Sequence, residues 1–292
     1  MPLLIFVTLL WAFSFSLIGV YLAGQVDSYF SAMTRILLAS LIFLPLLQWR
    51  RSDPRTAITL MAIGGVQLGL MYLFYYQSFL LLSVPEVLLF TIFTPLYITL
   101  LYDLLERRFS LWNLTVALLA VSGAAIIRWD KPNGNYWYGF AMVQGANLCF
   151  ALGQVGYRQF MRRHQPLAPR QTFGWFFLGA NLVTVTAWVF LGKAQYPQNS
   201  VQWGVLIWLG VVASGLGYFL WNKGTTQVTA ATLAAMNNAL IPAGLLVNLL
   251  IWNRDAPIIN LMIGGGVIAT AIMLNEWRNK QREIQHGKYR PT

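Results

Sequence analysis

Two stretches, EVLLFTIFTPLYITLLYDLLERR (residues 86–108) and LAAMNNALIPAGLLVNLLIWNRD (residues 233–255), each carry a proline part-way along an apolar run. The two prolines, Pro95 and Pro242, occupy the same place in their stretches and are 147 residues apart. A proline inside a helix has no N–H to donate, and its ring displaces the carbonyl four residues earlier. The pattern therefore predicts two interrupted helices at corresponding positions of a duplicated chain.

The displaced carbonyls would belong to Thr91 and Asn238. Because an unpaired carbonyl is costly in lipid, each must face protein, water or a ligand. Paired helix interruptions in two halves of a membrane protein indicate a transporter's substrate site. Prolines that only kink helices for packing would give the same pattern, since proline is frequent in membrane helices.

Composition indicates a membrane protein. The chain has 292 residues, of which 57% are hydrophobic and 10% charged, whereas a soluble domain carries about 25% charged residues. The net charge of +11 comes from short loops and the tail, so it indicates membrane topology and not a nucleic-acid partner. Cys149, the single cysteine, is interpreted as a small buried hydrophobe. The first apolar run lacks a preceding positive charge and a clear cleavage site, so it is predicted to be a membrane helix and not a signal peptide.

The expected fold is an all-α polytopic membrane protein with ten transmembrane helices, arranged as two inverted five-helix repeats. A spanning helix needs about 20 mostly apolar residues, and such segments fit near 3–22, 28–48, 57–80, 86–105, 111–128, 136–160, 171–191, 201–221, 228–252 and 258–277. Five is an odd number, so the second half would start from the opposite side of the membrane. The expected domains are residues 1–130 and 135–277, followed by a cytoplasmic tail at 278–292.

Loop charges predict the orientation. With the N-terminus inside, 15 Lys and Arg residues fall on the inner side and 4 on the outer side, and Arg35 falls within a helix. Positive charge collects on the cytoplasmic side of membrane proteins. Both termini are therefore expected in the cytoplasm.

Several short motifs in this order resemble the EamA type of the drug/metabolite transporter superfamily. They are Leu10-Trp11-Ala12, Thr34-Arg35, Thr94-Pro95 and Leu105-Glu106-Arg107. The resemblance covers about residues 3 to 277 and implies two five-helix halves. The second half departs from the pattern, because Asn253 stands where the family often has a glutamate.

Longer stretches are similar to the biotin transporters of enteric bacteria, the YigM type. They are LLWAFSFS (9–16), LAGQVDSYF (22–30), LLFTIFTPLYITLLYD (88–103), LGVVASGLGYFLWN (209–222) and MNNALIPAGLLVNLLIW (236–252). This resemblance implies a carrier in the bacterial inner membrane, surrounded by lipid, that takes up biotin or a similar carboxylate by alternating access. It implies neither an enzyme nor a cofactor.

Arg35 is the candidate for recognising a substrate carboxylate. It is the basic residue well inside a helix, about 10 Å below the outer surface at about 1.5 Å per residue. A charge at this depth is functional by default and needs a partner. The partner could be a substrate carboxylate, which guanidinium binds with two parallel hydrogen bonds, or structurally Glu86 or a backbone carbonyl.

Aromatic and amide side chains at similar depth are the other binding candidates. Tyr72, Tyr75 and Tyr76 offer an apolar face and a hydroxyl, which suits a ring-bearing ligand, although an interfacial aromatic band is the alternative. Amides both donate and accept hydrogen bonds, as a ureido group requires. Interhelical contacts are the alternative for these polar residues, which are Ser14, Thr91, Asn147, Asn181, Asn237 and Asn238.

Tyr218, Trp221 and Asn222 lie near the inner end of their predicted helix, as a gate or as part of an interfacial belt. The sequence has no Cys or His cluster with metal-binding spacing and no P-loop motif, so we expect no metal site and no ATPase. Biotin uptake is the leading prediction. Export of amino acids or other metabolites is the runner-up, ahead of a non-transporting receptor or a membrane enzyme.

Overall fold

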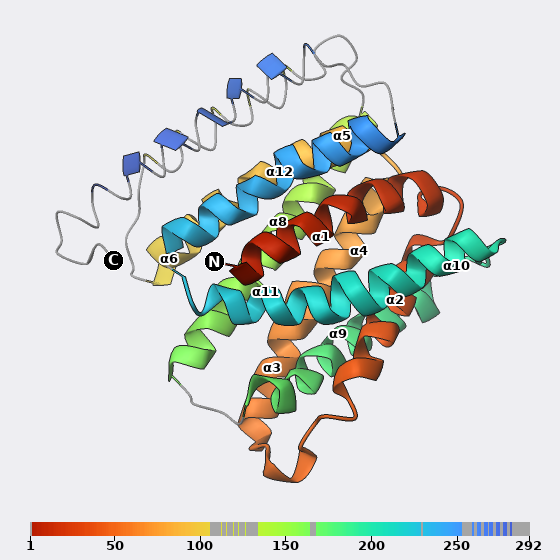
Figure 1. The fold of residues 1–292 in the computed structure, drawn as a ribbon, viewed down its shortest axis with the longest axis vertical. Helices are drawn as coiled ribbons and strands as arrows, with labels where there is room; N and C mark the ends of the chain where they lie inside the picture. The colour runs from red at the N-terminus through yellow and green to blue at the C-terminus, as the bar shows by residue number, and fades with distance from the viewer. Residues whose placement is uncertain are drawn as a thin grey trace.

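The computed structural model describes residues 2–105, 134–163, 168–228 and 230–252, with short pieces between residues 112 and 126 and between 259 and 281. Across these residues the secondary structure is helical (Figure 1). The α-helices are α1 (Pro2–Leu17), α2 (Ser28–Phe43), α3 (Pro54–Gly64), α4 (Met71–Ser78), α5 (Val84–Phe90), α6 (Thr94–Leu105), α8 (Gly134–Arg163), α9 (Pro169–Leu191), α10 (Ser200–Ile207), α11 (Gly217–Thr225) and α12 (Ala230–Trp252). The π-helical segments are η1 (Ile18–Leu22), η3 (Gly65–Leu70) and η5 (Trp208–Leu216), and the 3₁₀ turns are η2 (Trp49–Arg51) and η4 (Thr91–Phe93).

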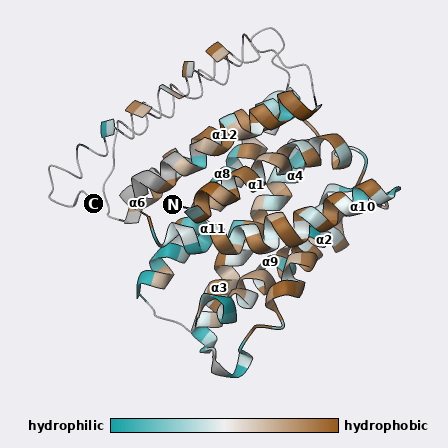
Figure 2. Cartoon of the chain, in the orientation of Figure 1, coloured by the Kyte–Doolittle hydropathy of each residue, from teal (hydrophilic) through white to brown (hydrophobic). Residues whose placement is uncertain are grey.

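The chain is an all-helical, multi-span membrane protein. Among the described residues, four helices are long and apolar enough to cross a membrane, namely Pro2–Leu22, Pro54–Ser78, Pro169–Leu191 and Ser200–Thr225. Shorter apolar helices cover Ser28–Phe43, Val84–Ile98 and Ala239–Trp252. Figure 2 shows apolar residues along the outer faces of these helices, where Leu41, Phe190 and Leu250 are exposed. The predicted spans 111–128 and 258–277 lie outside the described residues, apart from short pieces.

The end of the second predicted span was wrong. The sequence predicted a helix over 28–48, but α2 ends at Phe43. Pro45 follows shortly after and has no N–H with which to extend the hydrogen-bond ladder of the helix. The chain then turns through η2 before α3 begins at Pro54.

The predicted break at Pro95 is present, with its freed carbonyl shifted by one residue. The helix passes from α5 into η4 and then α6. In η4 the Thr94 N–H donates to the Thr91 carbonyl, three residues back. The Thr91 carbonyl is therefore occupied, which corrects the prediction. The Phe90 carbonyl, which Thr94 would bond in a regular helix, instead accepts from Asn147 Nδ2 at 2.8 Å.

The predicted break at Pro242 is not observed, because α12 continues through it as one helix. In Figure 1, α12 lies over α5 and α6, so the two proline-bearing stretches are neighbours in space. Tertiary packing supplies most of a helix's stability in proteins, and α12 packs along α1 as well as along α5 and α6. This packing holds the helix despite one lost hydrogen bond.

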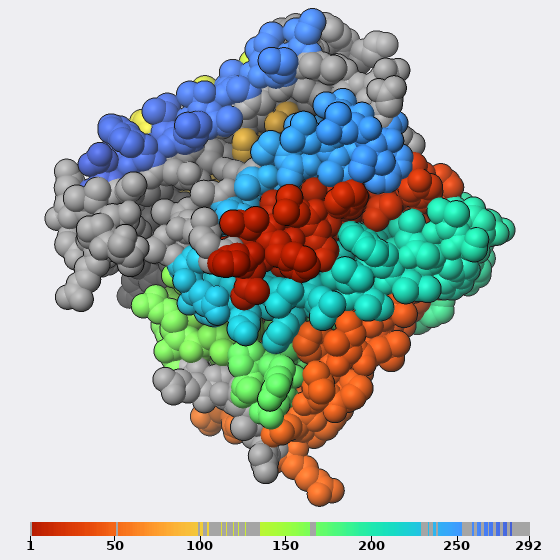
Figure 3. Space-filling view, in the orientation of Figure 1, coloured from red at the N-terminus to blue at the C-terminus, as the bar shows by residue number. Residues whose placement is uncertain are grey.

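One face of the molecule shows how the helices surround the centre. In Figure 3, α1 lies between α12 on one side and α10 with α11 on the other. The helix α4 packs on α8, and α2 packs on α9 and η5. Helices α3 and α9 cross closely, because a Cβ on Gly64 would lie 1.9 Å from the Phe176 carbonyl oxygen. Small residues at such crossings let membrane helices approach each other.

Candidate functional site

A partly open cavity lies among the helices of both halves of the sequence. Side chains reach it from α1, α2, α4, η4, α6, α8, α11 and α12. The lining comprises Trp11, Ser14, Phe15, Arg35, Met71, Tyr72, Tyr75, Thr91, Thr94, Ala146, Asn147, Phe150, Tyr218, Asn237 and Leu240.

The π-helical segment η5 holds Arg35 in place. Its glycines allow α2 to come close, since a Cβ on Gly210 would lie 2.7 Å from Leu38 Cβ and 3.1 Å from the Arg35 carbonyl oxygen. Arg35 Nε donates to the Leu209 carbonyl at 3.2 Å and to Ser214 Oγ at 2.5 Å. A π-helical stretch inside a helix is frequently found at functional sites.

The guanidinium of Arg35 is buried, with 2% of the residue exposed, and its carbon lies 4.3 Å from the centre of the Tyr72 ring. Its Nη1 is buried and forms no hydrogen bond with any described residue. Of the two structural partners that the sequence suggested for Arg35, Glu86 and a backbone carbonyl, the structure shows the carbonyl, which belongs to Leu209. The Glu86 carboxylate accepts at 2.8 Å from both the N–H and the hydroxyl of Ser83 at the start of α5. The Tyr76 hydroxyl also interacts with the guanidinium, so the unpaired capacity of Arg35 is that of Nη1.

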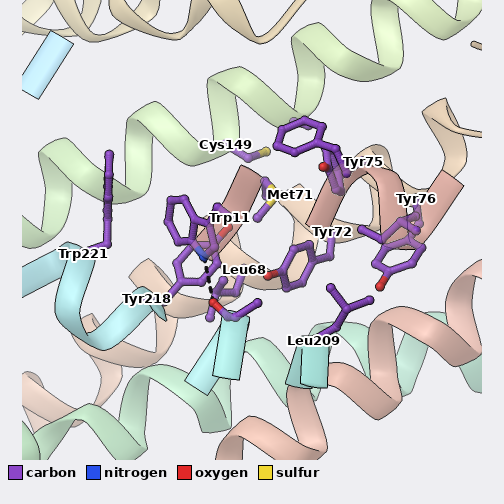
Figure 4. Packing of buried hydrophobic residues seen from close by; sticks show 14 of the residues in the cluster. Trp11, Leu68, Met71, Tyr72, Tyr75, Tyr76, Cys149, Leu209, Tyr218 and Trp221 are labelled. Atoms are coloured by element: carbon purple, nitrogen blue, oxygen red, sulfur yellow. Dashed lines mark hydrogen bonds between the residues drawn. The ribbon is translucent and has the colours of Figure 1, made fainter. Parts of the chain in front are cut away.

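Aromatic rings form much of the cavity lining. The Trp11 ring lies 4.7 Å from the Tyr218 ring and 4.9 Å from the Trp221 ring. The Tyr75 ring meets Phe15 edge-on at 5.5 Å. Figure 4 shows Trp11 and Tyr218 together near Tyr72, with Trp221 on the side of Trp11 away from Tyr72. Such rings provide flat apolar contact for a ligand's body.

Trp11 and Tyr72 are fixed by polar contacts to the same helix that holds Arg35. Trp11 Nε1 donates to the Ala213 carbonyl at 2.8 Å, a bond drawn as the dashed line in Figure 4. The Tyr72 hydroxyl shares a hydrogen bond of 2.9 Å with Ser214 Oγ. One segment, η5, therefore orients the cation and two of the aromatic rings.

Four of the lining residues, Thr91, Thr94, Asn147 and Asn237, are neutral and polar, and we call them the amide wall. The break at Pro95 supplies its centre, where Asn147 bonds the Phe90 carbonyl. Asn147 Oδ1 accepts from Thr94 Oγ at 3.3 Å. Asn237 comes from α12 and pairs with Gln154 of α8, with two contacts of 3.4 Å. In Figure 1, α12 and α2 lie on opposite sides of α1.

Most of the predicted site residues line one cavity, namely Arg35, Tyr72, Tyr75, Thr91, Asn147, Asn237 and, from the predicted gate, Tyr218. The side chain of Asn238 lies outside the described part of the chain. Trp221 and Asn222 are buried beside the cavity and do not line it. Trp221 donates to Gln154 Oε1 at 3.2 Å, and Asn222 pairs with Gln67 at 3.1 and 3.4 Å.

Sequence reasoning missed Ser214, Gln154 and Gln67. The two glutamines carry a usable signal, because an amide inside a predicted membrane helix needs a polar partner. Ser214 carries no such signal, because Ser is common at helix contacts in membranes. Its contact with Arg35 joins residues 179 positions apart in the sequence.

The arrangement suits a small ligand with an anionic end, an apolar ring-bearing body and a polar head. A buried cation attracts an anion strongly because the surrounding dielectric is low. The neutral amide wall offers hydrogen bonds without a second charge. Such a site can bind and orient its ligand.

Comparison with known sequences gives two matches to the EamA-like transporter family, over residues 1–129 and 137–277. The chain is 52% identical to a protein of Pseudomonas aeruginosa named "Probable biotin transporter", covering 98% of this chain and 100% of that one. It is 50% identical to the "Biotin transporter" of Escherichia coli K12, covering 94% of this chain and 92% of that one. A solved structure titled "Crystal structure of protein" superposes with a TM-score of 0.65 at 18% identity, covering 92% of this chain and 94% of its own.

Proposed function

This chain belongs to the EamA-like transporter family, and we propose that it imports biotin across the bacterial cytoplasmic membrane. The close relatives that carry this name match it over nearly their full length. Biotin has a carboxylate on an aliphatic chain, a sulfur-containing ring and a fused cyclic urea. These three parts correspond in kind to the buried cation, the aromatic rings and the amide wall of the cavity.

The observation that carries the binding mode is Arg35 Nη1, buried in the cavity wall without a hydrogen bond to any described residue. Desolvating an anion without a countercharge costs several kcal/mol, on the order of tens in the limit of an isolated ion. In our proposal the biotin carboxylate binds Arg35, and Tyr72, which stacks on the guanidinium, closes this end. Tyr75 packs beside the ligand's ring system.

We further propose ten transmembrane helices in two inverted five-helix halves, residues 1–130 and 135–277, with a cytoplasmic tail at 278–292. The two family matches cover nearly these ranges. Odd-numbered repeats insert in opposite senses. The excess of basic residues on one side supports cytoplasmic termini. A reporter active only in the periplasm, fused after Thr292, is expected to be silent.

Tyr218, Trp221 and Asn222 form the proposed gate at one end of the cavity. The indole of Trp221 packs on Trp11 and is 1% exposed. The hydrogen bonds between Asn222 and Gln67 join α11 to η3, and therefore join the two matched halves of the chain. Alternating access would separate these contacts as one half rocks against the other.

Uptake of labelled biotin tests the function. A biotin auxotroph lacking its own carrier should accumulate the label when it expresses this protein and not when it carries the empty vector. Repeating the assay with an uncoupler shows whether accumulation needs the proton gradient. Loss of label from preloaded cells, without uptake, would favour the exporter and overturn the proposal.

A further inference from the structure

The amide wall has its hydrogen-bond donors committed inside the protein. An amide NH₂ group carries two hydrogens. Those of Asn147 go to the Phe90 carbonyl at 2.8 Å and to Gln144 Oε1 at 3.2 Å. Those of Asn237 go to the Leu233 carbonyl at 2.8 Å and to Gln154 Oε1 at 3.4 Å. What each amide can still offer a ligand is a lone pair on its oxygen.

The orientation of both amides is fixed by backbone chemistry. The oxygen and nitrogen of an Asn side chain are assigned from the hydrogen-bond network. A backbone carbonyl can only accept, so the group facing the Phe90 or the Leu233 carbonyl must be the NH₂. Trp221 Nε1 can only donate, and its bond to Gln154 Oε1 fixes the orientation of that glutamine as well.

The two hydroxyls of the wall are committed in the same way. Thr91 Oγ donates to the Leu88 carbonyl at 2.6 Å. Thr94 Oγ donates to Asn147 Oδ1 at 3.3 Å. A hydroxyl has one hydrogen and two lone pairs. All four side chains of the amide wall therefore face the cavity as acceptors.

We propose that the amide wall is an acceptor surface that selects ligands by the N–H groups of their cyclic urea. This inference rests on the proposed function and adds which group of the ligand the amide wall recognises, namely the ureido N–H groups. Both ureido N–H groups point to Asn147 Oδ1 and Asn237 Oδ1, opposite the carboxylate at Arg35. A ligand whose ring carries an acceptor atom in place of an N–H would place that atom's lone pair against the lone pair of an Asn Oδ1. Such a ligand is bound more weakly.

Gln144 and Gln154 are positioning residues for this selection. Each takes one hydrogen of the amide beside it, so that the amide cannot turn a donor toward the ligand. Gln144 Oε1 also accepts from the Tyr97 hydroxyl at 3.3 Å, which holds it against α6. Neither glutamine lines the cavity, so removing one changes the amide beside the ligand without removing a direct contact.

Equilibrium binding to the purified full-length protein tests the proposal with three probes. The first is biotin. The second is desthiobiotin, which lacks the sulfur but keeps both N–H groups. The third is a cyclic carbamate in which an oxygen replaces one ureido N–H. We expect the carbamate to bind at least about ten-fold more weakly than desthiobiotin, because a site built to pair a polar group rejects an analogue lacking it.

Variants sharpen the test through the ratio of the carbamate and desthiobiotin dissociation constants. Gln144→Met frees one hydrogen of Asn147 toward the ligand, so the ratio should fall at least about three-fold. Gln144→Glu keeps the acceptor oxygens and should retain the wild-type ratio. Asn181→Leu removes a partly buried amide that bonds Ser40 away from the cavity, and it is the matched control. A purely structural role of Gln144 would weaken both ligands equally and leave the ratio unchanged.

The possible outcomes distinguish a failure of this inference from a failure of the proposed function, biotin import. Equal binding of carbamate and desthiobiotin by a wild-type protein that binds biotin would overturn the acceptor surface alone. Failure of the wild type to bind biotin would overturn the proposed function together with it. Should Gln144→Met not fold, the wild-type comparison of the two analogues still decides the question, and Gln154→Met tests the second amide.

Discussion

Two parts of the cavity lining, which we call the Arg35 end and the amide-wall end, differ in charge and in how their polar groups are held. At one end, Arg35 keeps a buried nitrogen without a hydrogen bond to the described residues, beside an aromatic ring. At the other end, Asn147 and Asn237 are neutral, and each donates both hydrogens of its side-chain NH₂ group to acceptors within the protein. The first end can supply a strong attraction, whereas the second supplies weaker hydrogen bonds with a fixed direction.

This difference assigns separate tasks to the two ends. A charged pair in a low-dielectric site gains much free energy but recognises many anions. A neutral amide with fixed orientation gains less, yet it distinguishes a donor from an acceptor on the ligand. We therefore expect substitutions at Arg35 to lower affinity for every carboxylate, and substitutions at the amide wall to change which carboxylate binds.

The largest effect is expected for Arg35→Ala. Removing a charge-assisted pair costs about 3 kcal/mol, which corresponds to at least about a hundred-fold loss in affinity. Arg35→Lys keeps the charge without the paired geometry of guanidinium and should retain part of the uptake. The measurement is biotin uptake at matched protein abundance, together with competition by a biotin amide, which should be weak against the wild type. Normal uptake by a well-expressed Arg35→Ala protein would contradict the proposal that the biotin carboxylate binds at Arg35.

A smaller effect is expected for Asn147→Leu, which tests the neutral end. The substitution removes one acceptor and leaves the Phe90 carbonyl without its side-chain donor, at a cost of about 1–3 kcal/mol. We expect the half-saturation concentration for biotin to rise about ten-fold and the protein's abundance to fall modestly. Asn181→Leu is the control, and an equal rise there would mean that any lost buried or partly buried amide has this effect.

The smallest effect is expected for Ser214→Ala. This substitution keeps Arg35 and the amide wall but removes a hydrogen-bond partner that orients Arg35. Ser214 Oγ joins Arg35 Nε to the Tyr72 hydroxyl. One lost hydrogen bond of about 1 kcal/mol predicts roughly a five-fold weaker affinity. Ser214→Thr keeps the hydroxyl and should retain most of the wild-type affinity. Unchanged affinity in Ser214→Ala would show that the Leu209 carbonyl alone positions the guanidinium.

Much of the fold followed from apolar segment length, and the misplaced boundary has a local cause. The helices Pro2–Leu22 and Pro169–Leu191 agree closely with the predicted spans at 3–22 and 171–191. The span predicted to reach residue 48 ends at Phe43 because of Pro45. The two prolines behaved differently, although each lacks an N–H and crowds the carbonyl four residues earlier. Whether the helix then breaks depends on the partners around it, such as Asn147 beside Pro95 and α1 beside α12.

The sequence by itself determined the membrane class, the family resemblance and the residue types that line the cavity. Those properties depend on composition and local spacing, which are readable along one chain. Only the tertiary structure decided which end of each amide faces the cavity and which atoms of Arg35 are free. These depend on contacts such as Arg35 with Ser214 and Asn237 with Gln154, which join distant parts of the chain. A side chain's remaining hydrogen-bond capacity is known only after every partner has been counted in space.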